Sequence, residues 1–164
     1  MWGRKKRNDK KKNTPQASKK DLPKRDVSIF EIRQAIQRFT SHLPDGVELQ
    51  TIINEDNTIN YELLSPFLEA IPNETYYMSK ETYEVFEEKD KQLAFDLDHI
   101  QQAIDKYMKQ TKELPIIDGD PYNKVNYFKL ERLGLITYRP NYTFYITDDE
   151  FLITYEAPFP KKDQ

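Results

Sequence analysis

Residues 97–110, LDHIQQAIDKYMKQ, carry the clearest periodicity in the chain. Their apolar residues recur at intervals of three and four, which predicts an amphipathic α-helix that buries one face. Asp98 lies near the expected N-terminal end and Lys106 and Lys109 lie toward the other end, as the helix dipole favours. We expect the other elements to pack against the apolar face, which comprises Leu97, Ile100, Ala103, Ile104, Tyr107 and Met108.

Two further helices are predicted on either side of this segment. Ser28 and Glu31 form a capping box in front of a helix over residues 29–40. Downstream, Asp120-Pro121 is typical of a cap and first helical residue, and Gly134 of a helix end. We expect this last helix to turn Val125, Phe128 and Leu133 inward.

Three β-hairpins are predicted between and after the helices. The strand pairs are 47–53 with 58–64, 75–78 with 82–86, and 142–147 with 151–155. Ser65-Pro66 predicts a brief helical turn with proline in its first position, and Ser79 could alternatively cap a helix through Glu88. The predicted fold class is α+β, with antiparallel hairpins packed by about three helices.

Charge divides the chain unevenly at about residue 26. Residues 1–26 hold eleven Lys/Arg and three Asp/Glu, a net +8, whereas residues 27–164 hold fourteen and twenty-five, a net −11. All twenty Tyr and Phe lie beyond residue 26, so the body can bury a core. We therefore predict a disordered basic arm over 1–26, reaching roughly 25–30 Å, a single domain over 27–160, and a short tail over 161–164.

Composition also limits the location and the chemistry. The chain has no cysteine, which excludes disulfides and thiolate metal sites and fits a reducing compartment. The basic start is not followed by the apolar stretch of a secretory signal, and no apolar run is long enough to span a bilayer. Only four glycines are present, and they form neither a phosphate-binding loop nor a dinucleotide fingerprint. We expect a cytoplasmic protein without a cofactor.

Acidic pairs and histidines are the remaining candidates for catalytic or metal chemistry. Asp96 and Asp120 fall where helix caps are expected, and Asp98 complements a helix dipole. A small enzyme that uses Asp118 or Asp120 in a cleft is therefore kept as an alternative, whereas His42 and His99 have no metal-ligand spacing and are expected to be structural.

Residues 129–155, KLERLGLITYRPNYTFYITDDEFLITY, resemble the recognition helix and wing of winged-helix DNA-binding proteins. The resemblance rests on the helix-to-strand turn at Leu133-Gly134-Leu135-Ile136, and it implies a DNA-binding regulator as a second alternative. The acidic hairpin tip at 148–150 opposes contact with a polyanion, and the helix offers only Lys124, Lys129 and Arg132 to phosphates.

The stretches IDGDPYNKVNYFKLERLGL at 117–135 and YITDDEFLITYE at 145–156 also resemble small uncharacterised cytosolic proteins of Bacillus-type bacteria, over roughly residues 75–160. That resemblance implies a cytoplasmic location and carries no activity with it.

The basic arm carries the main functional prediction. Runs such as GRKKR and KKK are typical of segments that bind phosphate-rich partners, although the same composition can serve as a solubilising tail. We predict a non-enzymatic interaction domain whose arm adheres to an anionic partner, either nucleic acid, including the ribosome, or a membrane surface; a protein partner is not predicted. The predicted binding residues are Trp2, Arg4, Lys5, Lys6, Arg7, Lys10, Lys11, Lys12, Lys19, Lys20, Lys24 and Arg25.

Overall fold

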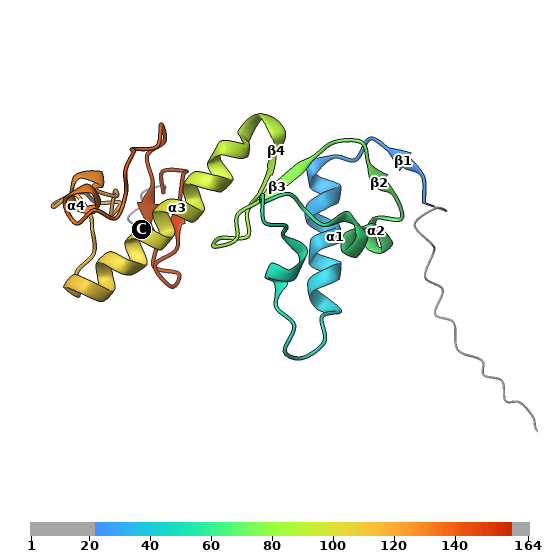
Figure 1. Ribbon diagram of the computed structural model, residues 1–164, viewed down its shortest axis with the longest axis horizontal. Coiled ribbons are helices and arrows are strands. Elements are labelled where there is room, and N and C mark those ends of the chain that lie inside the picture. The colour runs from blue at the N-terminus through green and yellow to red at the C-terminus, as the bar shows by residue number, and fades with distance from the viewer. Residues whose placement is uncertain (1–21, 159–164) are drawn as a thin grey trace, which may run out of the picture. The chain divides into compact units, whose positions relative to one another are not determined.

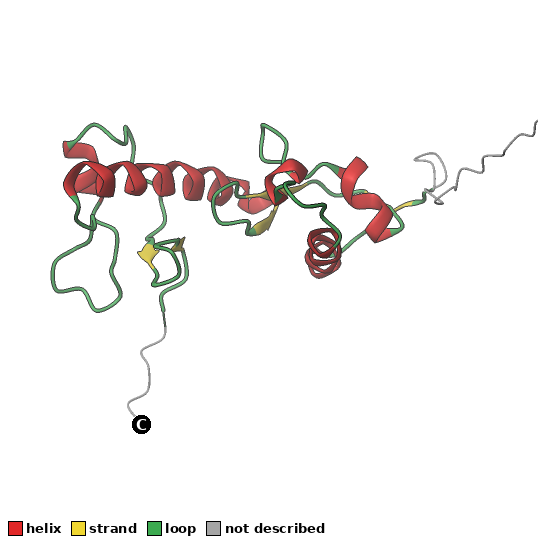
Figure 2. Ribbon diagram, turned by 90° about the horizontal axis from the view of Figure 1, so that it is seen from below, coloured by secondary structure: helices red, strands yellow, loops and turns green. Residues whose placement is uncertain are grey.

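The computed structural model describes residues 22–158, which form two compact units (Figures 1 and 2). Unit 1 comprises the chain up to Ile52 together with Asn60–Glu74, and unit 2 comprises Ile53–Ile59 together with the chain from Thr75 onward. Both units contain helices and short strands, so the predicted α+β class is confirmed.

Unit 1 is built on two helices that pack together, α1 (Ile29–Ser41) and α2 (Tyr61–Leu68). The predicted capping box is present at the start of α1, where Ser28 Oγ accepts from Glu31 N and the Glu31 carboxylate accepts from Ser28 N. A 3₁₀ turn, η2 (Leu49–Ile52), follows α1. The buried apolar side chains of the unit are Val27, Ile32, Ala35, Ile36, Phe39, Ile52, Leu64 and Ala70.

The predicted hairpin of 47–53 with 58–64 is wrong. Only its turn and a single bridge between Ile53 and Ile59 are present, closed by a 2.8 Å hydrogen bond from Asn54 N to Thr58 O. The segment after the turn is helical because the Asn60 side chain caps α2 by accepting from Glu62 N. The apolar residues at 63, 64, 67 and 68 follow helical spacing.

The position predicted for Pro66 is also wrong. Pro66 lies inside α2 and does not open a helix of its own, since the helix already begins at Tyr61. The helix ends at Glu69, whose backbone is left-handed (φ 56°).

Unit 2 is organised by α3 (Lys91–Thr111), which extends the helix predicted over 97–110 by nearly two turns at its N-terminal side. A short 3₁₀ turn, η3 (Glu88–Asp90), leads into it. Its apolar face packs into a core with residues from both hairpins, as predicted from its periodicity. The most deeply buried side chains of this core include Leu97, Ile100, Ile104, Leu130 and Phe144.

Two of the predicted hairpins are present in unit 2. β3 (Tyr76–Met78) pairs antiparallel with β4 (Val85–Glu87), which decides against the alternative helix capped by Ser79. β5 (Tyr145–Ile146) pairs antiparallel with β6 (Ile153–Thr154) and is shorter than predicted. Each pair is a separate two-stranded sheet.

The last helix differs from its prediction. α4 (Tyr127–Arg132) begins only after Asn126, whose side chain accepts from Phe128 N and Lys129 N, so the helix is six residues long. The later start rotates the buried face: Leu130 is 0% exposed, whereas Phe128 is 60% exposed and Leu133 is also exposed. The prediction that Phe128 and Leu133 point inward is therefore wrong, while Val125 is buried as predicted.

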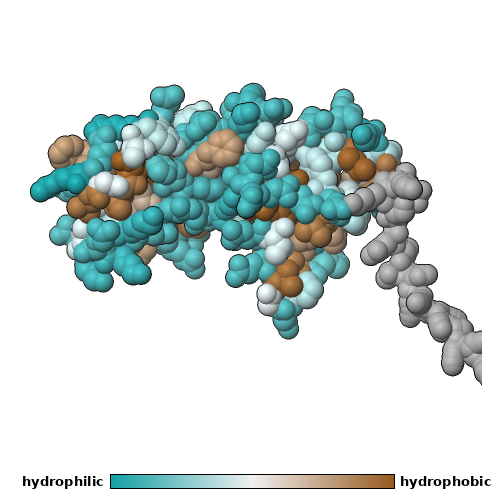
Figure 3. All heavy atoms as spheres, viewed as in Figure 1, coloured by the Kyte–Doolittle hydropathy of each residue, from teal (hydrophilic) through white to brown (hydrophobic). Residues whose placement is uncertain are grey.

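The described chain begins within the segment predicted as an arm. β1 (Lys24–Arg25) pairs parallel with β2 (Ile71–Pro72), so residues 24–25 belong to unit 1. The boundary at 26, a single domain over 27–160 and a tail over 161–164 remain predictions; residues 1–21 and 159–164 lie outside the described chain. Hydrophilic residues predominate on the face drawn in Figure 3, with apolar residues scattered among them.

Candidate functional site

Most of the predicted binding residues lie outside the described chain. Lys24 and Arg25 are described, and both are exposed. The ten others are Trp2, Arg4, Lys5, Lys6, Arg7, Lys10, Lys11, Lys12, Lys19 and Lys20.

Residues 23–27, here called the arm root, are held to unit 1 by backbone hydrogen bonds. Ile71 N donates to Pro23 O at 2.8 Å, and Asn73 N donates to Arg25 O at 3.0 Å. These bonds join residues almost fifty positions apart in the sequence. The arm root is therefore paired with β2 in unit 1.

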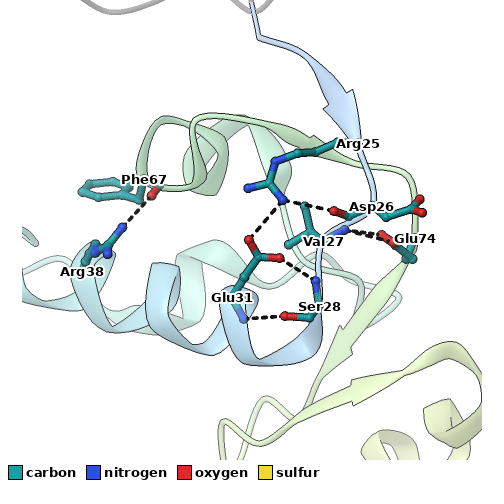
Figure 4. A network of polar contacts seen from close by, with 8 residues as sticks. All are labelled: Arg25, Asp26, Val27, Ser28, Glu31, Arg38, Phe67 and Glu74. Carbon is teal, nitrogen blue, oxygen red and sulfur yellow. Dashed lines mark hydrogen bonds and ion pairs between the residues drawn. The ribbon is translucent and has the colours of Figure 1, made fainter.

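A buried contact secures the end of the arm root (Figure 4). The backbone N–H of Val27 donates to both carboxylate oxygens of Glu74, at 2.9 and 3.1 Å. Val27 is 2% exposed, and Tyr61 Oη donates to the backbone carbonyl of Glu74 at 2.8 Å. Hydrogen bonds to a carboxylate are stronger than those between neutral groups, so this contact fixes the direction in which the chain enters α1.

Arg25 is oriented by Glu31 on the first turn of α1. Its Nη1 donates to Glu31 Oε1 at 3.1 Å and to the Asp26 carbonyl at 3.1 Å, while Glu31 Oε2 accepts from Ser28 N at 2.9 Å. The Ser28 N–H, assisted by the Arg25 guanidinium, holds the pKa of Glu31 below its usual value. The capping box and the arm root thus share one carboxylate.

Beside this pair lies a shallow groove of about 160 Å³, here called the arm-root groove. Arg38, one helical turn beyond Gln34, donates from Nη1 to the Phe67 carbonyl at 3.3 Å. The Phe67 ring meets Phe39 edge to face, with ring centroids 5.9 Å apart. The groove is lined mostly by polar atoms, from Arg25, Glu31, Gln34, Arg38, Phe67 and Leu68.

Gln34, Arg38 and Glu74 were not among the residues selected from the sequence. Gln34 and Arg38 follow Glu31 at spacings of three and seven, so they share a face of α1, and this spacing was a usable signal. Nothing in the sequence pairs Glu74 with Val27, because that contact joins residues 47 positions apart.

Asp118 and Asp120, the residues of the alternative enzyme, do not converge. The Asp118 side chain is 93% exposed and lies 3.4 Å from Lys129 Nζ. Asp120 Oδ2 accepts from the backbone of Tyr122 at 2.9 Å and of Lys124 at 3.0 Å, which is a local turn contact. The predicted helix at Pro121 is absent, so Asp120 caps a turn and not a helix.

Asp96 was predicted to cap a helix, and this prediction is wrong because α3 begins at Lys91. Its Oδ1 accepts from Tyr138 Oη at 2.8 Å and from Gln92 Nε2 at 3.0 Å. Burial, together with the bond to Asp96, raises the pKa of Tyr138 to about 12. The His99 ring stacks on Tyr138 with centroids 5.1 Å apart, and its buried Nε2 has no hydrogen-bond partner among residues 22–158. The cluster ties the segment at Tyr138 to α3.

Asp98 is a second buried carboxylate on α3, and it is saturated by donors. Oδ1 accepts from Ser79 Oγ at 2.6 Å and Glu81 N at 3.1 Å, and Oδ2 accepts from Asn57 Nδ2 at 2.7 Å and Lys80 N at 3.1 Å. We call this arrangement the Asp98 clasp. It holds the loop between β3 and β4 and leaves little capacity for a ligand.

The segment that resembles a winged helix is arranged differently from a recognition helix and wing. α4 has only six residues, and β5 and β6 have two each. A second groove, of about 360 Å³, lies beside α4 and is lined by Tyr107, Thr111, Glu113, Lys129, Arg132 and Leu133. Its two cations are accompanied by an acid, and no strongly basic face results.

Two general findings apply to residues 22–158. No group of three or more histidine or acidic side chains is placed to hold a metal ion in this part of the chain. None of its helices combines the length and the apolar character that a membrane span requires.

Comparison with known proteins identifies the family of this chain. Residues 22–155 match the family described as "Protein of unknown function (DUF3939)". Because the match covers most of the chain, the protein belongs to this family. No curated protein and no solved structure matches the chain.

Proposed function

We propose that this member of the DUF3939 family is a binding protein, and not an enzyme, that adheres electrostatically to an anionic partner through its basic N-terminal arm. The partner is a nucleic acid, including ribosomal RNA, or an anionic membrane surface. The proposal places the protein in the cytoplasm, on its resemblance to cytosolic proteins of Bacillus-type bacteria.

The charge distribution supports this proposal. Eleven of the twenty-five lysines and arginines lie within the first 26 residues, and the other 138 residues carry a net charge of −11. Such a body repels polyanions, so attraction requires the arm. Lysine and arginine that neutralise phosphates release condensed counterions, which gives binding that weakens steeply with salt.

The single observation that carries the proposal is the anchoring of the arm root. Backbone bonds from Ile71 and Asn73, together with the Glu74 carboxylate, fix the chain directly behind the basic segment. A charged segment whose root is hydrogen-bonded to a folded unit couples its binding to that unit, whereas a tail that only improves solubility needs no such anchor.

The test compares two matched pairs of substitutions in the full chain. Lys5→Gln with Lys6→Gln should weaken binding to a fluorescent oligouridylate and reduce the log–log salt slope by about 1.4, since each single-strand contact contributes about 0.7. Lys106→Gln with Lys109→Gln, on the exposed side of α3, should leave both quantities unchanged. Equal losses of affinity in the two pairs of substitutions, or no binding at low salt, would indicate that the arm is only a solubilising tail.

Trp2 distinguishes the two kinds of partner. An indole prefers the headgroup region of a bilayer, so Trp2→Ala should weaken binding to vesicles of phosphatidylserine and phosphatidylcholine. The same substitution should have little effect on oligouridylate, because phosphate neutralisation does not need the ring. A loss confined to vesicles would identify the membrane as the partner.

A further inference from the structure

Two arginines that line the arm-root groove have N–H donors that the described chain does not use. The hydrogen bonds of Arg25 and Arg38 leave from Nη1 in both residues, to Glu31, Asp26 and Phe67. A guanidinium has five N–H groups, and within residues 22–158 those on Nε and Nη2 of both arginines have no acceptor. The groove is therefore rich in donors.

The acidic residue of the groove does not cancel this property. Both oxygens of Glu31 already accept, one from Ser28 N and one from Arg25. Its carboxylate serves to orient the guanidinium, and the lining retains one net positive charge from two arginines and one glutamate. The Gln34 side chain adds an amide that can donate.

The groove has room for a small anionic group. The groove, of about 160 Å³, is open to solvent and large enough to receive one phosphate group. Planar guanidinium groups match phosphate oxygens in bidentate geometry. The charge and the arginine donors of the groove thus suit a phosphate group.

We propose that the arm-root groove binds one phosphate group of a single-stranded nucleic-acid backbone. This inference rests on the proposed function and names the partner. A flexible single strand can direct one phosphate into a recess, whereas the headgroup phosphates of a bilayer form a flat layer. The groove therefore favours a single strand over a bilayer surface.

The first experiment measures binding of the full chain to a fluorescent twelve-residue oligouridylate over a salt series. Arg38→Gln should weaken binding about fivefold to tenfold and reduce the log–log salt slope by about 0.7. Arg33→Gln removes the same charge from an exposed site on α1 outside the groove and should leave both values unchanged. Arg38→Lys should restore the slope but not the full affinity, because lysine lacks the planar fork.

A second experiment separates the groove from the arm. Inorganic phosphate is titrated into the full chain with the nine lysines and arginines of residues 1–21 replaced by glutamine, and the arginine Nε–Hε signals are followed by NMR. The signals of Arg25 and Arg38 should shift and saturate, and the signal of Arg33 should not.

The outcomes distinguish failure of the groove from failure of the arm. If Arg38→Gln binds oligouridylate as tightly as the parent and phosphate shifts no arginine signal, the groove is not a phosphate site, even where neutralising the arm abolishes binding. If phosphate shifts Arg25 and Arg38 but neutralising the arm changes nothing, the groove stands and the arm proposal fails. Weaker binding of Arg38→Gln to anionic vesicles alone would overturn the choice of nucleic acid.

Discussion

The Asp98 clasp and the arm-root groove both join polar side chains to backbone groups, yet they differ in what remains unused. In the clasp, each oxygen of a carboxylate that is 8% exposed accepts two hydrogen bonds. In the groove, Arg25 and Arg38 are exposed and donate from one nitrogen each. A saturated buried ion stabilises a loop, whereas exposed donors with spare capacity can accept a ligand.

Burial and a full set of hydrogen bonds mark the Asp98 carboxylate as structural. Exposure and unused donors mark Arg25 and Arg38 as groups that can bind a ligand. Buried charges that lose their partners destabilise strongly, while exposed ion pairs contribute little to stability. Substitutions in the clasp should therefore reduce stability. Substitutions of the groove arginines should change binding while leaving the fold intact.

The largest effect is expected from the clasp. Asp98→Ala removes the acceptor of Ser79 Oγ and of Lys80 N, and leaves Asn57 Nδ2 and Glu81 N with one acceptor each in place of two. It should lower the free energy of unfolding by about 3–5 kcal/mol in urea denaturation followed by circular dichroism. Asp118→Ala removes a carboxylate whose side chain is 93% exposed and should change it by less than about 0.5 kcal/mol. Similar losses of stability in the two variants would show that the clasp contributes no more to the fold than an exposed acid does.

A smaller loss of stability is expected at the arm root. Glu74→Ala removes the acceptor of the buried Val27 N–H and should lower the free energy of unfolding by about 1.5–3 kcal/mol. Glu48→Ala, an exposed acid of the same unit, serves as the control and should be neutral in the same denaturation. A neutral Glu74→Ala would show that the arm root is not held as described.

The capping box should contribute less to stability than the Glu74 contact does. Ser28→Ala removes the hydroxyl that accepts from Glu31 N, and thermal or urea unfolding should show a loss of about 1 kcal/mol. Ser41→Ala, at the other end of α1, is the matched control and should cost less than about 0.5 kcal/mol. A loss at Ser41 as large as that at Ser28 would contradict the assignment.

The smallest expected effect is a change in the pKa of Glu31. Because the folded pKa of Glu31 lies below its usual value of 4.5, its contribution to stability is present above that value and is lost as the pH falls through the folded pKa. Arg25→Gln should raise this pKa but leave it below 4.5, since the Ser28 N–H remains, and carbon NMR of the Glu31 carboxyl follows it. An unchanged pKa would show that Arg25 does not engage Glu31.

Local signals in the sequence were sufficient for part of the fold. The capping box at Ser28 and the periodicity of residues 97–110 predicted α1 and the main part of α3, because both depend on neighbours within one or two helical turns. The β3–β4 hairpin was likewise predicted from adjacent residues. In these three elements the deciding contacts are close in sequence, and the pattern was sufficient.

Predictions failed where a single cap shifted a helix. Asn60 begins α2 before Pro66, and Asn126 begins α4 six residues after Asp120. The second shift alone exchanges Phe128 for Leu130 in the core. Short asparagine caps are common in turns as well, so their effect depends on the packing that follows.

The candidate site was predicted only in part. Arg25 was selected for its charge, but its fixed position depends on the pairing of β1 with β2 and on Glu74, which lie more than 45 residues away. Arg38 and Gln34 join it only because α1 packs beside α2. Such long-range pairings follow from the fold and not from local sequence.

The most direct test of the central claim is an NMR map of the full chain with an unlabelled twelve-residue oligouridylate at low salt. We expect the signals of Gln34, Arg25 and Arg38 to shift together with those of the basic segment, and the Asn57 and Asp98 signals of the clasp to stay unchanged. Shifts at the clasp or beside α4, with none at Arg25 and Arg38, would contradict this expectation.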